Sequence, residues 1–96
     1  MSNLSVIQSD RAPPPLIRSL LVSIAEGFNL TVQLRRVDKA TVNVMVGFFA
    51  ASTIACASTG NHEAAALFRE AGNKLDVNWR SYESVVRGLI EKLKTF

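Results

Sequence analysis

The hydrophobic residues in the first third of the chain follow the spacing of one helical face. From residue 17 onward they recur every three or four positions, which places them on one side of an α-helix. A glycine that follows such a run can end the helix in a left-handed conformation. We therefore predict a helix from Pro15 to Glu26 that Gly27 ends. Its apolar face comprises Ile17, Leu21, Ile24 and Phe28.

Two later segments show the same spacing, and each follows an asparagine. Asn61 is a favourable N-cap for a helix that ends near residue 71. Asn78 can cap the last helix, and Val77 before it can pack against Tyr82 as a hydrophobic staple. The apolar stripe of the last helix comprises Trp79, Tyr82, Val86, Leu89, Leu93 and Phe96.

Residues 30–46 fit two secondary structures. Their apolar residues alternate in two short runs, as in the strands of a hairpin. A longer series with four- and three-residue spacing instead indicates a helix over residues 30–55, broken near Asp38. Asn29 is a favourable cap before this helix and Gly60 a favourable terminator after it. The helix is therefore our prediction, and a hairpin at residues 30–46 within an α+β fold is the alternative.

Four helices with short links predict an all-α fold, an antiparallel bundle of about four helices. Residues 1–13 end in a run of prolines and are predicted to form a flexible N-terminal arm, and residues 14–96 to form a single helical domain. Residues 60–71 resemble the second helix of a tetratricopeptide-type hairpin. This resemblance implies that the helix packs against a neighbouring helix as a hairpin.

The composition is more apolar than a small soluble monomer needs. The 96 residues are 48% hydrophobic and 20% charged, with a net charge of +3. A domain of this size has a large surface for its volume, so the surplus predicts a second buried surface, at an oligomer interface or in a membrane. The surplus lies in residues 40–62, which contain no Lys, Arg, Asp or Glu.

The sequence offers little for catalysis, and we expect a protein that is not an enzyme. The single histidine, His62, falls at the start of a predicted helix. The single cysteine, Cys56, lies among apolar residues, without the cations that would activate a thiolate. The carboxylates are scattered, so we expect no catalytic residues, no metal site and no cofactor. One cysteine also favours a reducing compartment, so we expect a cytoplasmic protein.

A protein-interaction module of the adaptor, chaperone or inhibitor type is the function that these features favour. A helix that is apolar nearly all round has to be covered on all sides, by the protein itself or by a partner. Gly47, Ala51 and Ala55 recur every four residues and allow another helix to come close. We predict binding to a protein partner, to a second copy in a homodimer or higher oligomer, or to both. The predicted interface comprises Val42, Met45, Val46, Phe48, Phe49 and Ser52.

Two alternatives remain at this stage. The first is a small basic regulator that binds nucleic acid through Arg35, Arg36 and Lys39. Residues 30–36 and 37–42 resemble the two helices of a helix-turn-helix, although the turn between them is shorter than in that family. The second alternative is a small membrane protein, since the uncharged segment is long enough to cross a bilayer.

Overall fold

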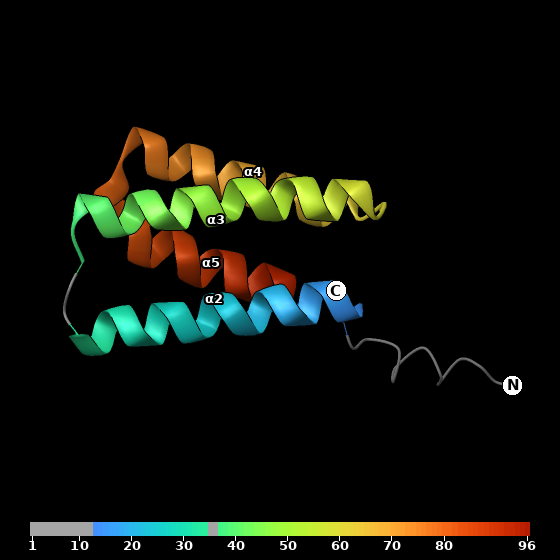
Figure 1. The fold of residues 1–96 in the computed structure, drawn as a ribbon, viewed down its shortest axis with the longest axis horizontal. Coiled ribbons are helices and arrows are strands. Elements are labelled where there is room, and N and C mark those ends of the chain that lie inside the picture. Colours follow the sequence, from blue (N-terminus) through green and yellow to red (C-terminus); the bar gives the residue numbers. More distant parts are fainter. Residues whose placement is uncertain (1–12, 35–36) are drawn as a thin grey trace, which may run out of the picture.

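The computed structural model describes residues 13–34 and 37–96, which fold into four antiparallel α-helices and one turn of 3-10 helix (Figure 1). These described residues contain no strand. The helices lie side by side in an up-down-up-down arrangement, in which α3 packs along α4 and α2 packs along α5. The elements are α2 (Pro15–Leu34), α3 (Lys39–Ser58), α4 (His62–Val77), η1 (Trp79–Ser81) and α5 (Tyr82–Leu93).

The predicted all-α bundle is confirmed, but its first helix is longer than predicted. Gly27 does not end α2, which continues to Leu34. A glycine inside a helix costs about 1 kcal/mol, and burial of the Phe28 side chain beyond it contributes more than that. The hydroxyl of Thr31 also donates to the carbonyl oxygen of Gly27, at 2.8 Å. The prediction of a helix end at Gly27 was therefore wrong.

The break predicted near Asp38 lies between α2 and α3. The backbone of Asp38 is extended, and its carboxylate accepts a hydrogen bond from the backbone N–H of Thr41 at 2.9 Å. This N-cap satisfies one of the free donors at the start of α3. Asn29 lies inside α2 and caps nothing, so the predicted cap at that position was wrong. Residues 30–34 and 39–46 are helical, which also excludes the alternative hairpin.

Gly60 ends α3, as predicted. Its φ of 83° is in the left-handed region that favours glycine. The N–H of Asn61 donates to the carbonyl of Cys56 at 2.8 Å, and the N–H of Gly60 donates to that of Ala57 at 3.1 Å. These two bonds form a Schellman motif, which turns the chain back so that α4 can pack against α3.

The helix hairpin implied by the resemblance of residues 60–71 is present, since α4 packs antiparallel to α3. The predicted end of α4 near residue 71 was wrong, because Gly72 is buried in the contact with α3 and the helix continues to Val77. Val77 is 87% exposed, so the predicted staple against Tyr82 is absent. Asn78 does act as a cap, for the short η1 helix before α5.

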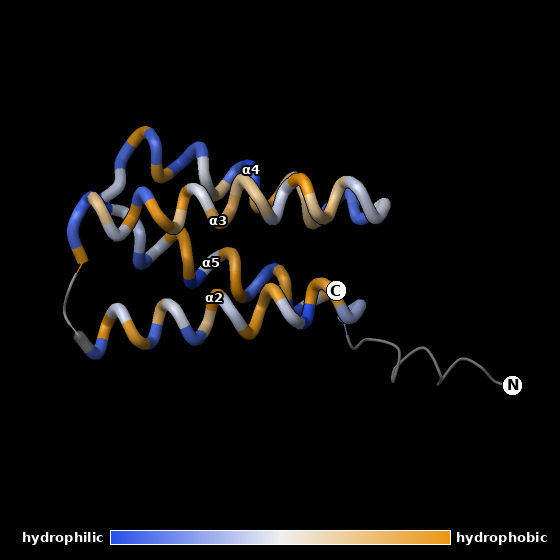
Figure 2. The backbone as a smooth tube through the Cα atoms, viewed as in Figure 1, coloured by the Kyte–Doolittle hydropathy of each residue, from blue (hydrophilic) through white to orange (hydrophobic). Residues whose placement is uncertain are grey.

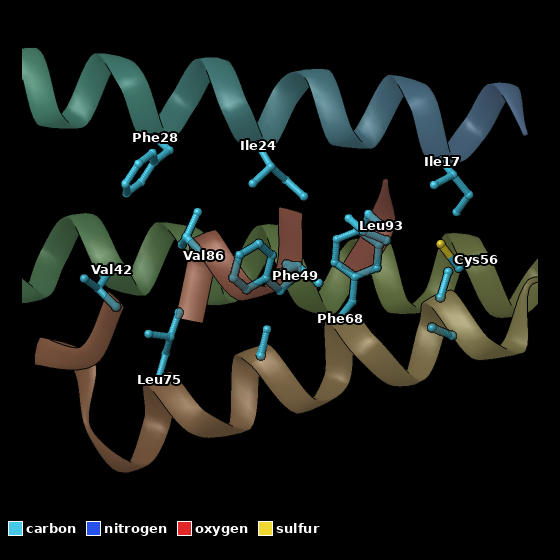
Figure 3. Close-up of a cluster of buried hydrophobic side chains, with 14 residues drawn as sticks. Ile17, Ile24, Phe28, Val42, Phe49, Cys56, Phe68, Leu75, Val86 and Leu93 are labelled. Atoms are coloured by element: carbon cyan, nitrogen blue, oxygen red, sulfur yellow. The ribbon is translucent and has the colours of Figure 1, made fainter. Parts of the chain in front are cut away.

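One hydrophobic core joins all four helices (Figure 3). Ile17, Ile24 and Phe28 of α2 point toward the side chains of the other helices. Phe49 of α3 and Phe68 of α4 pack at the centre, with ring centroids 6.0 Å apart. The buried core also includes Val42, Cys56, Ala64, Ala65, Ala71, Leu75, Val86, Leu89 and Leu93.

We expect the substitution Gly60→Ala to destabilise the protein by about 1–2 kcal/mol, because the left-handed conformation of residue 60 is unfavourable for a residue with a Cβ. The control is Gly88→Ala in α5, where a Cβ meets no atom within 4 Å. Alanine should stabilise that helix by about 0.5–1 kcal/mol. Urea unfolding followed by circular dichroism measures both, and equal effects of the two substitutions would contradict the Schellman motif.

Candidate protein-docking surface

The helix α3 has one face in the core and an opposite face in solvent. Val42, Phe49 and Cys56 recur every seven residues and are at most 2% exposed. Seven residues make close to two helical turns, so these side chains point the same way, toward α4 and α5. Ser52 lies on the same side, and its hydroxyl donates to the carbonyl of Phe48 at 2.8 Å, which satisfies this buried polar group.

This orientation divides the predicted interface residues into two groups. Val42, Phe49 and Ser52 are buried in the core, so the prediction that they lie on an accessible interface was wrong for the single chain. Met45, Val46 and Phe48 pack against the edge of the core and stay partly exposed. These last three residues remain available to a partner.

Two of the accessible residues, Met45 and Phe48, line an open groove between α2 and α3. The groove has a volume of about 360 Å³. The α2 wall combines the small residues Ser23, Gly27 and Thr31 with the larger Ile24 and Phe28, and Val86 of α5 also lines the groove. Sequence reasoning ended the first helix at Gly27 and so placed Thr31 outside it, and local spacing does not reveal that α2 and α3 lie side by side. The lining residues are Ser23, Ile24, Gly27, Phe28, Thr31, Thr41, Val44, Met45, Phe48, Phe49 and Val86.

The threonine hydroxyls on the groove walls are engaged within the protein. Thr31 Oγ1 donates to the carbonyl of Gly27, and Thr41 Oγ1 donates to the Asp38 carboxylate, both at 2.8 Å. Among the described residues, the rest of the lining is largely apolar and includes no charged side chain. This described part of the groove can therefore bury apolar side chains of a partner.

A second open cleft lies between α4 and α5 and has a different character. Its volume is about 610 Å³, but charged residues line it. Lys74 on its rim pairs with Glu70 at 4.0 Å, and both side chains are more than half exposed. A solvated ion pair of this kind is typical of an ordinary polar surface. The α2–α3 groove is therefore the better candidate for docking.

The outer face of α3 is uncharged and exposes large apolar side chains to solvent. Val44 is 74% exposed and Ile54 is 68% exposed. Gly47 and Ala51 lie between them on the same face and are also exposed. The sequence pointed to the small residues and to part of residues 42–54 as an interface, but Val44 and Ile54 were not among the interface residues named from it.

Charge is divided unevenly between the helices. In the described chain, α2 carries only Arg18 and Glu26, and α3 carries only Lys39, at its first residue. Beyond Asn43, α3 runs in orange and pale tones in Figure 2, whereas blue segments recur along α4 and α5. Of the three ion pairs in the described chain, one lies on α4, one lies on α5, and one joins α5 to Lys94 in the turn after it. Depletion of charge is what distinguishes the core of a protein interface from other surface.

The groups considered for catalysis or nucleic-acid binding are not brought together. His62 is exposed at the start of α4. Cys56 is fully buried, and this burial raises the pKa of its thiol. In the described chain no three His, Cys, Asp or Glu side chains gather where they could hold a metal ion. Lys39 is exposed, and Arg35 and Arg36 lie outside the described residues.

Comparison of the chain with protein-family models, curated proteins and solved structures found no match. The class of the protein is thus given by its fold, an all-α bundle of antiparallel helices in the part of the chain that the structure describes.

We expect the two faces of α3 to respond differently to truncation. Phe49→Ala should cost about 3–5 kcal/mol of unfolding free energy, because it leaves a cavity against Phe68. Val44→Ala should change stability by at most about 0.5 kcal/mol, because Val44 lies in solvent. Urea unfolding at a protein concentration of a few micromolar compares the two variants. A large loss at Val44 and a small one at Phe49 would mean that α3 is rotated about its axis.

Proposed function

We propose that the protein is a non-enzymatic interaction module that binds an apolar helix of a partner protein in the α2–α3 groove. The observation that carries the proposal is the chemistry of this groove, which is open, largely apolar and lined by no charged side chain among the residues that the structure describes. An amphipathic helix lays its apolar face into such a groove with anchors at i, i+3, i+4 and i+7.

The dimensions of the groove support a helix as its ligand. Ser23, Gly27 and Thr31 recur every four residues and form one wall with small side chains. They extend over about 12 Å, which corresponds to two turns of a bound helix. Gly27 in the middle of this wall has no side chain, so a partner can approach closely there. The phenylalanine rings of Phe28 and Phe48 offer apolar surface to its anchors.

A membrane location is the second candidate, and it is supported by the composition of α3. This helix is long and apolar enough to cross a bilayer, with a mean hydropathy of 1.7. However, α4 packs along it and exposes Glu63, Arg69, Glu70 and Lys74. If α3 crossed a bilayer in this fold, these charged side chains would enter the hydrocarbon at a cost of several kcal/mol. A protein partner is therefore the better explanation for the apolar surface.

Binding of a nucleic acid finds no comparable support among the described residues. The basic side chains of α4 and α5 alternate with acidic ones, and Arg87 pairs with Glu83 at 3.1 Å. Electrostatic attraction to phosphates needs basic residues that cluster on one face.

The groove is tested with a labelled synthetic helix of Leu, Ala and Gln about four turns long, in fluorescence anisotropy. We expect the wild-type chain to bind this probe saturably. Gly27→Phe should weaken binding at least tenfold, because a Cβ at Gly27 meets no atom within 4 Å and the ring can fill the groove. Circular dichroism should show that the variant stays folded.

The matched control is Ala66→Phe, which adds the same ring to an exposed position of α4. This variant should bind the probe as the wild type does. The proposal fails if the wild type does not bind the probe, or if both variants bind it with equal affinity.

A further inference from the structure

We infer that the outer face of α3 binds a second copy of this chain, with the two α3 helices antiparallel. This inference goes beyond the proposed function, because it concerns the solvent-facing side of α3, which shares only Val44 with the lining of the groove. Six residues form the face, which we call the outer stripe. They are Ala40, Val44, Gly47, Ala51, Ile54 and Ser58.

The outer stripe has the geometry of a two-helix seam. Its residues are spaced by four and three positions in strict alternation, which is the repeat of a coiled coil. All six are exposed in the single chain, and the stripe lies opposite the face that Phe49 turns to the core. A helix face with this repeat that no described residue of the chain covers can accept another helix.

The order of side-chain sizes along the stripe reads the same in both directions. A two-fold axis can cross the outer stripe at the height of residue 49 along the helix. It would pair Val44 with Ile54 of the second copy, and Gly47 with Ala51 of the second copy. The pairs at the two outer ends would be Ala40 with Ser58. A two-fold interface requires such self-complementarity, because each contact occurs twice.

The same order of sizes suits two helices that cross. The axes of crossing helices are closest at the crossing point and diverge on either side. Gly47 and Ala51 would lie at the crossing point, where small side chains allow close approach. The branched side chains of Val44 and Ile54, 74% and 68% exposed in the single chain, would fill the wider spaces on either side.

The charges at the ends of α3 favour the antiparallel direction. Lys39 is exposed at the first residue of α3, and the last turn of α3 contains no basic residue. In an antiparallel pair, Lys39 of one chain would lie near Thr59 at the carbonyl end of the second. A cation is stabilised at that negative end of the helix dipole. In a parallel pair, the two Lys39 side chains would instead lie close together.

The size of the surface sets the strength of the dimer. A helix of 20 residues is about 30 Å long and about 10 Å wide, so each copy would cover on the order of 300 Å². Stable dimers bury about 800 Å² per partner. The dimer is therefore weak and forms at high micromolar protein concentration.

Sedimentation equilibrium over about 10 μM to 1 mM tests the association. We expect the average mass to rise from 10.5 kDa toward twice that value. Ala51→Glu should weaken association at least tenfold, because it brings a charge to the crossing point, and it should leave the fold intact because Ala51 is exposed. Ala66→Glu on α4 is the matched control and should associate as the wild type does. Lys39→Gln should weaken the dimer by a few fold.

Disulfide cross-linking tests the direction of the helices, in a Cys56→Ala background. A mixture of Val44→Cys chains and Ile54→Cys chains should give a cross-linked heterodimer on mild oxidation. Val44→Cys chains alone should not cross-link, because the two sulfur atoms would be about 15 Å apart along the antiparallel helices. The opposite result would indicate a parallel pair and would overturn the inference.

Three outcomes separate this inference from the proposed groove. A chain that stays monomeric up to 1 mM overturns the inference, whatever the groove binds. Association that appears only with phospholipid vesicles also overturns it, and indicates that a bilayer covers α3. We expect Gly27→Phe to dimerise normally and Ala51→Glu to bind the helical probe normally, so either surface can fail without the other.

Discussion

The contact between Phe49 of α3 and Phe68 of α4 fixes the orientation on which the rest of the structure depends. Their ring centroids are 6.0 Å apart, and both side chains are at most 2% exposed. Gly72 of α4 is buried opposite Phe49, and a Cβ placed there would make an ordinary contact, 3.9 Å from the Cβ of Phe49. With Phe49 held in the core, the helical repeat turns Gly47 and Ala51 outward. The rotation of α3 about its axis thus determines which of its residues line the groove and which form the outer stripe.

Much of the fold could be predicted from local signals in the sequence. Gly60 ends α3 because a left-handed residue is needed there, and no tertiary contact decides that. The last helix was predicted correctly in outline because its apolar stripe and its charged back are separate. The start of this helix was harder to predict. The predicted staple needs Val77 to contact Tyr82, but Val77 is 87% exposed.

Two helix ends were predicted wrongly because burial of side chains in the core outweighs the local tendency of glycine to end a helix. Gly27 and Gly72 both resemble helix ends in the sequence, but Phe28 and Leu75 beyond them are buried in the core and extend the helices. Burial of such a side chain is worth about 1.5–3 kcal/mol, which exceeds the cost of about 1 kcal/mol for a helical glycine. Local spacing does not reveal this difference.

The burial of the predicted interface residues could not be determined from the sequence, for a related reason. α3 is apolar nearly all round, so its own sequence does not specify which side faces the core. The stripes of α4 and α5 make that choice, through Phe68 and Val86. The predicted set therefore mixed buried residues such as Val42 with accessible ones such as Met45.

The composition of the outer stripe points to a requirement beyond the stability of a single bundle. A lysine or glutamate at Ala51 would cost a monomer almost nothing, because the position is exposed and both residues are good helix formers. The backs of α4 and α5 carry such residues throughout, and three ion pairs form among them and in the turn that follows. An uncharged face has an energetic use only where it leaves water, since each Å² of apolar surface removed contributes about 25 cal/mol. In the described chain, part of the surplus of hydrophobic residues therefore lies on the solvent-facing side of α3, where Val44 and Ile54 are 74% and 68% exposed.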